Sequence, residues 1–180
     1  CNNNQLSSLP TLPDSLKSLY CFGNLLTSLP TLPIGLKKLN CDANQLNGLP
    51  TLPSSLTHLN CNYNHFNSFP TLPATLIEFY CHSMGLSVLP TLPNNLKTLN
   101  CKNNSLVTLP QLPQSLNQLH CEFNFITHLP TLPNSLNGLY CNNNNLSSLP
   151  PLPSALSGLY CYTNQLTELP SLPTTLTFLE

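Results

Sequence analysis

Apolar residues recur along the chain with a period of 20 residues, from the first residue to the last without a gap. Counted from its cysteine, each unit places apolar side chains at positions 1, 6, 9, 12, 16 and 19, in the pattern C-x-x-N-x-L-x-x-L-P-x-L-P-x-x-L-x-x-L-x. The nine units begin at Cys1, Cys21, Cys41, Cys61, Cys81, Cys101, Cys121, Cys141 and Cys161. One unit cannot bury six apolar side chains alone, so the pattern predicts stacked units with one continuous core.

The secondary structure follows from two features of the unit. Around positions 19 and 1, as at Leu19 and Cys21, apolar residues alternate with polar ones, which is the period of a half-buried strand. Such strands would pair in parallel about 4.8 Å apart and form a concave sheet. Prolines fill positions 10 and 13 of every unit, which excludes a helix there and favours an extended or polyproline-like convex side. The sequence predicts a solenoid with little or no α-helix.

Leu16-x-x-Leu19-x-Cys21-x-x-Asn24-x-Leu26 resembles the leucine-rich-repeat core L-x-x-L-x-L-x-x-N-x-L, and the resemblance covers the whole chain. The next segment, Leu29-Pro30-Thr31-Leu32-Pro33, resembles the short convex segment of the bacterial leucine-rich-repeat effectors, whose units are also 20 residues long. Cysteine stands where that subfamily usually has a β-branched residue. The resemblance implies a leucine-rich-repeat solenoid that works as a recognition module.

We expect a single solenoid over residues 1–180, in which the nine units themselves supply no capping element. Solenoids need capping elements with a polar outer face. We therefore expect either that the chain is a segment of a longer array, or that neighbouring copies cover its ends.

Asparagine fills position 4 of every unit except the fifth, which has Met84. Its amide can accept from and donate to backbone groups of the next coil, so we interpret it as a structural ladder rather than a ligand site. We expect a looser or rerouted turn at Met84-Gly85. The ladder comprises Asn24, Asn44, Asn64, Asn104, Asn124, Asn144 and Asn164.

The charge composition excludes several partners. Only 6% of residues are charged, against about 25% in an ordinary domain, and the chain has five lysines and no arginine. Nucleic-acid binding needs a field of cations, so we expect no nucleic-acid partner. No apolar run approaches the roughly 20 residues of a membrane span, so we expect no membrane insertion.

Nine cysteines could bind a metal ion or form disulfides. They lie 20 residues apart on one ladder, however, and not in the close pairs typical of zinc sites. Parallel Cβ vectors about 4.8 Å apart exceed the usual disulfide separation near 3.8 Å. We interpret the cysteines as buried free thiols, with occasional adjacent disulfides or soft-metal binding as alternatives.

No catalytic pattern stands out. The histidines lack a triad-like arrangement, and the closest grouping, His120 with Glu122, is interpreted as a surface pair. The chain has no Gly-rich phosphate loop, H-E-x-x-H motif or nucleophile elbow. We therefore expect a non-enzyme with no cofactor and no metal.

The variable positions locate a candidate binding surface, because the invariant ones are committed to packing. On the concave face these are positions 18, 20 and 2, with position 3 at the rim, and exposed aromatics are enriched in interface hot spots. Gly138 and Gly158 are expected to open space beside the rings. The alternative is that the tyrosines stack only to stabilise the sheet. The candidate site is His120, Glu122, Phe123, Tyr140, Tyr160, Tyr162 and Phe178.

Two function hypotheses follow. The first is a non-catalytic protein-protein interaction scaffold, with a secreted, cell-surface or host-delivered location favoured. The second is a structural protein that assembles head to tail into filaments through uncapped ends. A third, ice or carbohydrate binding by threonines at position 11, is weakened because Gln111, Pro151 and Ser171 interrupt that row.

Overall fold

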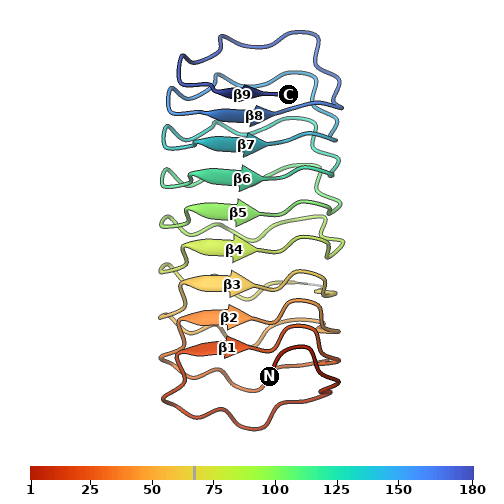
Figure 1. Ribbon diagram of the computed structural model, residues 1–180, viewed down its shortest axis with the longest axis vertical. Helices are drawn as coiled ribbons and strands as arrows, with labels where there is room; N and C mark the ends of the chain where they lie inside the picture. The colour runs from red at the N-terminus through yellow and green to blue at the C-terminus, as the bar shows by residue number, and fades with distance from the viewer. Residues whose placement is uncertain (67) are drawn as a thin grey trace.

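The computed structural model describes residues 1–66 and 68–180, and these form a stack of regular coils around one core (Figure 1). Each coil contributes one short strand, and the nine strands form one parallel sheet in sequence order. The described residues contain no helix, so the predicted fold class is confirmed. The strands are β1 (Ser18–Tyr20), β2 (Lys38–Asn40), β3 (His58–Asn60), β4 (Glu78–Tyr80), β5 (Thr98–Asn100), β6 (Gln118–His120), β7 (Gly138–Tyr140), β8 (Gly158–Tyr160) and β9 (Phe178–Leu179).

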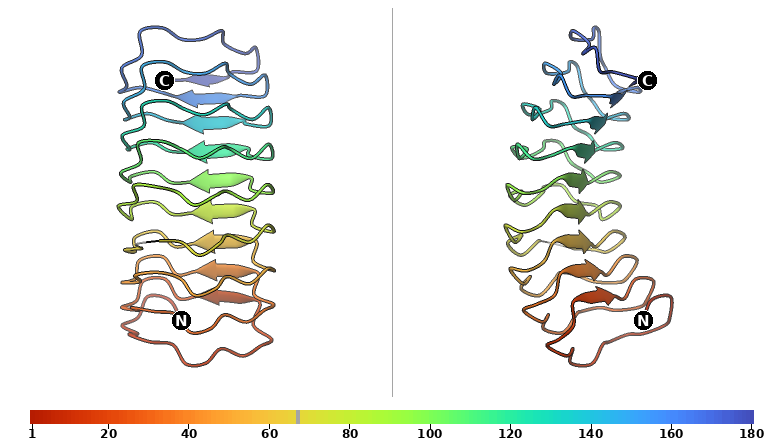
Figure 2. Two further views of the ribbon diagram at one scale, coloured as in Figure 1. Left: turned by 180° about the vertical axis from the view of Figure 1, so that it is seen from behind. Right: turned by 60° about the vertical axis from the view of Figure 1, so that its left-hand side comes forward.

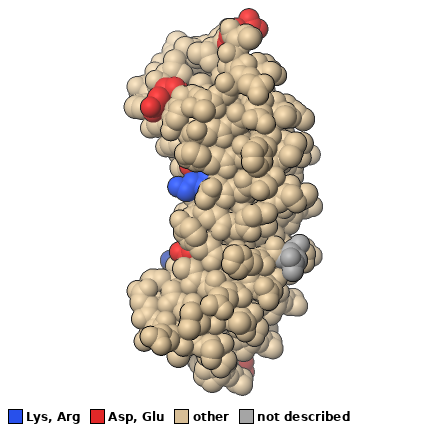
Figure 3. Space-filling view, turned by 90° about the vertical axis from the view of Figure 1, so that its right-hand side faces the viewer, with Lys and Arg blue, Asp and Glu red and all other residues tan. Residues whose placement is uncertain are grey.

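The strands pair without any slip, so that each position of the unit lies beside the same position of the next coil, as Leu39 does beside Leu59. The middle residue of each strand points into the core, and the two flanking residues point outward. The solenoid curves with the sheet on its inner side, as the side view in Figure 2 and the hollowed outline in Figure 3 show. Equivalent variable positions therefore form continuous rows along the concave face.

The convex side is extended, as the prolines predicted. In every coil the carbonyl of the proline at position 13 accepts a hydrogen bond from the N–H of the leucine at position 16, as Pro33 does from Leu36 at 3.0 Å. This turn brings the chain back to the next strand. A serine or threonine at position 15 links many coils; Ser55 Oγ donates to the carbonyls of Ile34 and Leu36 at 2.8 and 2.7 Å. The sequence pattern gave no sign of this second ladder, because position 15 also holds Gly35 and Ala155.

The asparagine ladder is present, but its partners lie in the preceding coil as well as its own. Asn44 Oδ1 accepts from the N–H of Leu26 at 3.0 Å, and its Nδ2 donates to the carbonyls of Cys21, Cys41 and Asp42 at 3.0 to 3.1 Å. One amide thus satisfies backbone groups of two coils at once. The expectation that the partners belong to the next coil was wrong in direction.

The turn at Met84 is rerouted, as predicted. Met84 is buried, and its side chain has no amide oxygen that could accept a hydrogen bond as asparagine does. The backbone N–H of Met84 instead donates to Asn104 Oδ1 at 3.1 Å. Asn104 Oδ1 also accepts from the N–H of Leu86 at 3.0 Å. The next residue, Gly85, takes a φ of 73°, a left-handed conformation that no other coil shows at this position.

Candidate binding surface

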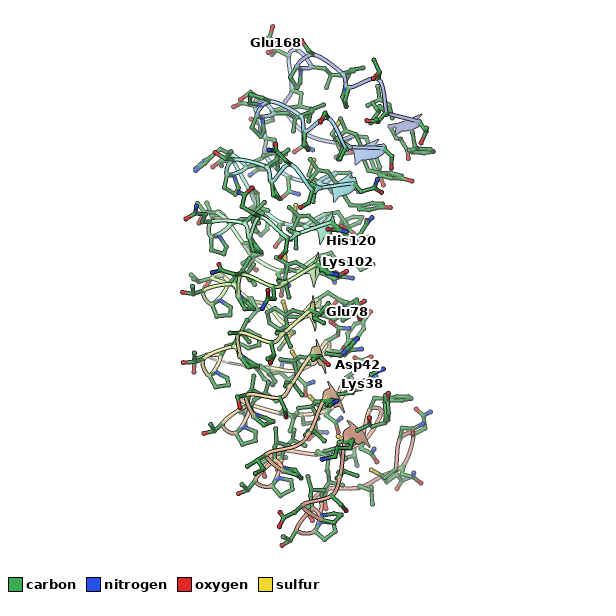
Figure 4. All side chains as sticks on the ribbon, turned by 90° about the vertical axis from the view of Figure 1, so that its left-hand side faces the viewer. Lys38, Asp42, Glu78, Lys102, His120 and Glu168 are labelled. Carbon is green, nitrogen blue, oxygen red and sulfur yellow. The ribbon has the colours of Figure 1, made fainter. Side chains whose placement is uncertain are left out.

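The outward side chains of positions 18, 20 and 2 pave the concave face. Most of them are only half exposed, because each is flanked by its counterparts in the two neighbouring coils. Charged groups are sparse on the molecule (Figure 3), and several of them gather on this face. Figure 4 shows, along the inner side of the solenoid, Lys38, Asp42, Glu78, Lys102 and His120, whereas Glu168 lies on the end coil.

Four of the predicted site residues form one continuous stack of rings. The His120 and Tyr140 rings lie 4.1 Å apart between centroids, those of Tyr140 and Tyr160 lie 4.4 Å apart, and those of Tyr160 and Phe178 lie 4.5 Å apart. The interplanar angles are 10°, 16° and 23°, so all three contacts are stacked. Burial, and next the neighbouring Tyr160, raise the pKa of the Tyr140 hydroxyl, which therefore stays protonated at neutral pH.

Phe178 joins this stack from a different row. It stands at position 18 beside Gly158, whereas the other three rings stand at position 20. Gly158 has no side chain, and the Tyr160 ring lies where a Cβ on Gly158 would meet it at 3.7 Å. A contact at 3.7 Å is an ordinary van der Waals distance, so a Cβ would fit beside the Tyr160 ring. That Gly158 opens space for a partner beside the rings stays a prediction.

The second glycine behaves differently. A Cβ on Gly138 would collide with the Gln118 amide of the neighbouring strand, because the Gln118 side chain lies directly over the glycine. The expectation that Gly138 opens space beside the tyrosines was therefore wrong. An adjacent long side chain fills the site.

Glu122 is not a surface residue. It is 8% exposed, and its Oε1 lies 3.8 Å from both Lys102 Nζ and His120 Nδ1. Its Oε2 is buried without a hydrogen-bond partner. The interpretation of His120 and Glu122 as a surface pair was wrong on burial, because the outward side chain at position 2 is covered by its neighbours in the row. The two distances exceed hydrogen-bond length, so neither contact is a direct hydrogen bond.

The two remaining predicted residues lie outside the stack. Tyr162 is 42% exposed and follows β8. Phe123 is 52% exposed at the rim and lines a hollow of about 320 Å³ with Tyr63, Ser83, Lys102 and Asn103. The structure thus divides the predicted site into an aromatic stack and a separate rim hollow.

The first four strands frame another hollow on the concave face, of about 240 Å³. Tyr20 and Tyr80 stand at its two ends with Asn40 and Asn60 between them. Tyr80 was not among the predicted site residues, although its position 20 in the repeat marks it as outward-facing. Glu78, also on this hollow, lies 3.7 Å from His58 Nε2.

The cysteines are free, and all except Cys1 are buried, so the interpretation as buried thiols is confirmed for the other eight. Several thiols donate to the carbonyl of the last residue of their own unit, which lies one turn further along the solenoid, as Cys61 Sγ does to Tyr80 O at 3.4 Å. Burial raises the pKa of Cys21 to about 11 and raises that of Cys61 well above its ordinary value. A protonated, covered thiol is a poor nucleophile and a poor metal ligand.

Within residues 1–66 and 68–180, no three histidine, cysteine or acidic side chains gather closely enough to hold a metal ion. The same residues include no helix with the length and hydrophobicity needed to cross a membrane.

No protein-family model and no curated protein sequence matches the chain. Solved structures do. YopM of Yersinia pestis, described as a leucine-rich effector protein, is 36% identical with a TM-score of 0.88, and the match covers 98% of this chain and 57% of YopM. The functional domain of InlJ from Listeria monocytogenes, described as including a cysteine ladder, is 30% identical with a TM-score of 0.81, over 92% of this chain and 39% of that one.

A third similar structure is a Shigella effector leucine-rich-repeat domain, which is 30% identical with a TM-score of 0.58. That match covers 91% of this chain and 67% of the Shigella domain. The chain spans little more than half of YopM and less than half of the InlJ domain. With its cysteine and asparagine ladders, the chain belongs to the leucine-rich-repeat proteins, and its 20-residue units resemble those of the bacterial leucine-rich-repeat effectors.

Proposed function

We propose that the chain is a non-catalytic scaffold that binds another protein through the aromatic end of its concave face. The observation that carries the proposal is the stack of His120, Tyr140, Tyr160 and Phe178 on the outward side of the sheet. Phe178, at the end of the stack, and Tyr162, beside it, are 45% and 42% exposed. Large aromatic side chains held rigid by their neighbours lose little conformational entropy on binding and are typical of interface hot spots.

The chemistry of this face favours a protein over other macromolecules. Four aromatic rings offer a broad apolar contact, and Glu122 and Lys102 lie beside it as a balanced ion pair. Interface cores combine aromatic residues with few unpaired charges. The similar Yersinia and Shigella proteins are described as effectors, which agrees with a recognition role.

The test is affinity capture of proteins from a cell extract with three forms of the chain. The first is the wild type, and the second carries Tyr162→Ser and Phe178→Ser. The third carries Phe125→Ser and Val107→Ser, which alter side chains that are 55% and 52% exposed but lie outside the sheet. Urea unfolding shows whether all three forms are folded.

We expect a specific protein to be retained by the wild type and by the Phe125/Val107 control, and lost with the Tyr162/Phe178 variant. Equal retention by all three folded forms would contradict the proposal, because the contact would then lie elsewhere.

A further inference from the structure

Position 3 of every coil has a left-handed backbone conformation. The φ angles run from 48° at Tyr63 to 64° at Gly23. Glycine tolerates this conformation without cost, and asparagine tolerates it better than most residues. Gly23, Asn3, Asn103 and Asn143 therefore suit the position. Bulky side chains do not.

Two aromatic residues nevertheless occupy it, Tyr63 with φ 48° and Phe123 with φ 56°. Their side chains are 55% and 52% exposed, so burial in the core does not compensate for the unfavourable backbone. A strained residue that gives the fold little in return indicates a role in contact with another molecule. The Tyr63 ring is also held in place, edge to face with His82 at a centroid distance of 4.9 Å.

Tyr63 and Phe123 stand three coils apart, about 14 Å at the spacing of paired strands. Between them lies the rim hollow of about 320 Å³, whose floor carries Ser83 and Asn103. Asn103 Nδ2 donates to Ser83 Oγ at 2.9 Å, and Ser83 Oγ also lies 3.0 Å from His82 Nδ1. These bonds fix the two polar side chains. Asn103 Oδ1 has no partner among the described residues and is free to accept a hydrogen bond from a ligand.

Lys102 is the one charged residue among the five that line the hollow, and the buried Glu122 carboxylate, which does not line it, offsets the lysine charge. Lys102 Nζ lies 3.8 Å from Glu122 Oε1, and burial together with nearby Lys102 lowers the pKa of His82, which is therefore neutral at pH 7. With the lysine charge offset by this carboxylate, the hollow favours an uncharged ligand over an ionic one.

The backbone at the rim is already committed. The N–H of Tyr63 donates to His82 O at 3.1 Å, and that of Phe123 donates to Asn142 O at 3.1 Å. A peptide therefore cannot add itself as a strand here, because strand addition needs free backbone groups. A ligand must therefore be recognised by side chains. The aromatic rings of Tyr63 and Phe123 lie at the two ends of the hollow, and the amide of Asn103, the hydroxyl of Ser83 and the ammonium of Lys102 lie between them.

We propose that this rim hollow, formed by Tyr63, Ser83, Lys102, Asn103 and Phe123, binds an uncharged oligosaccharide. The apolar C–H faces of two sugar rings pack on Tyr63 and Phe123. The hydroxyl groups of the rings between them bond to Asn103 Oδ1, Ser83 Oγ and Lys102 Nζ. The site is separate from the His120–Phe178 stack, so it does not depend on the protein-binding proposal. It also lies away from the interrupted threonine row of the convex side.

The experiment uses an array of neutral linear oligosaccharides of glucose, mannose, galactose and N-acetylglucosamine, two to four rings long, followed by titration calorimetry of those that bind. The informative variants are Tyr63→Asn and Phe123→Asn. Each removes a ring and places at a left-handed position a residue that tolerates it. We expect each variant to lose at least tenfold in affinity while its melting temperature rises by about 2–4 °C or stays unchanged.

Thr163→Asn is the matched control, since Thr163 also has a positive φ, 53°, but lies two coils beyond Phe123. It should keep the wild-type affinity. The proposal is overturned if no neutral oligosaccharide on the array binds the wild type, or if both asparagine variants bind as the wild type does.

Discussion

The Tyr160 ring lies between two others, stacked on Tyr140 at 4.4 Å and on Phe178 at 4.5 Å. This arrangement lets the sheet be stabilised by the same rings that are proposed to bind a partner. The two roles differ in what the loss of one ring does to the free energy of unfolding.

Replacing Tyr160 with serine removes both contacts and should lower the free energy of unfolding by about 1–3 kcal/mol, since each aromatic pair contributes about 0.5–1.5 kcal/mol beyond its buried area. Tyr162→Ser is the control; it changes an exposed ring outside the stack and should alter stability by less than about 0.5 kcal/mol. Urea unfolding measures both. A double-mutant cycle with Tyr140→Ser isolates the pair energy, and a coupling near zero would show that the stack does not stabilise the sheet.

Met84→Asn should restore the interrupted ladder. An amide at position 84 can accept a hydrogen bond from the N–H of Phe66 and donate to carbonyls of its own and the preceding coil. Asn44 makes the equivalent bonds at its place in the repeat. We expect a gain of about 1 kcal/mol in the free energy of unfolding, the net contribution of one or two buried hydrogen bonds. Met84→Leu, which keeps an apolar side chain, is the control. An asparagine variant less stable than the leucine variant would show that the fifth coil needs the apolar side chain.

The buried thiols predict loss of stability at alkaline pH. Burial raises the pKa of Cys21 from an ordinary value of 9.0 to about 11 and also raises that of Cys61 well above 9.0, so folded thiols stay protonated where unfolded ones ionise. Below about pH 9 both states bind the proton and stability does not depend on it; above pH 9 the unfolded state releases it and stability falls. The slope is about 1.4 kcal/mol per pH unit for each protected thiol.

The measurement is the free energy of unfolding in urea at pH 8, 9 and 10 under reducing conditions. Cys101→Val removes one fully buried thiol. It should reduce the fall in the free energy of unfolding per pH unit above pH 9 by the contribution of one thiol. An identical slope in the wild type and in this variant would mean that the thiols ionise equally in both states.

The self-assembly hypothesis predicts a different particle in solution. Recognition through the sheet face leaves the end coils unused, so we expect light scattering to give a mass near 19.8 kDa that does not rise with concentration. Head-to-tail assembly would instead give elongated particles that grow with concentration. Regular fibres seen by electron microscopy would favour the filament over the scaffold.

The sequence by itself determined the coil, the sheet and the register. Six apolar positions in an ungapped 20-residue unit leave one way to bury them, and Pro30 and Pro33, with their counterparts, restrict the convex backbone locally. The asparagine ladder and the exception at Met84 could be predicted for the same reason: each depends on a position in the repeat and on its immediate coils.

Only the tertiary structure decided which outward side chains meet. Phe178 stands beside Gly158 yet stacks on the Tyr160 ring, while Gln118 covers the space at Gly138. Glu122 is buried, and Phe123 joins Tyr63 across three coils rather than the stack. These outcomes depend on the size and direction of side chains in several neighbouring coils at once. The repeat pattern determines the backbone position of each residue, whereas its neighbours in the adjacent coils determine the direction and contacts of its side chain.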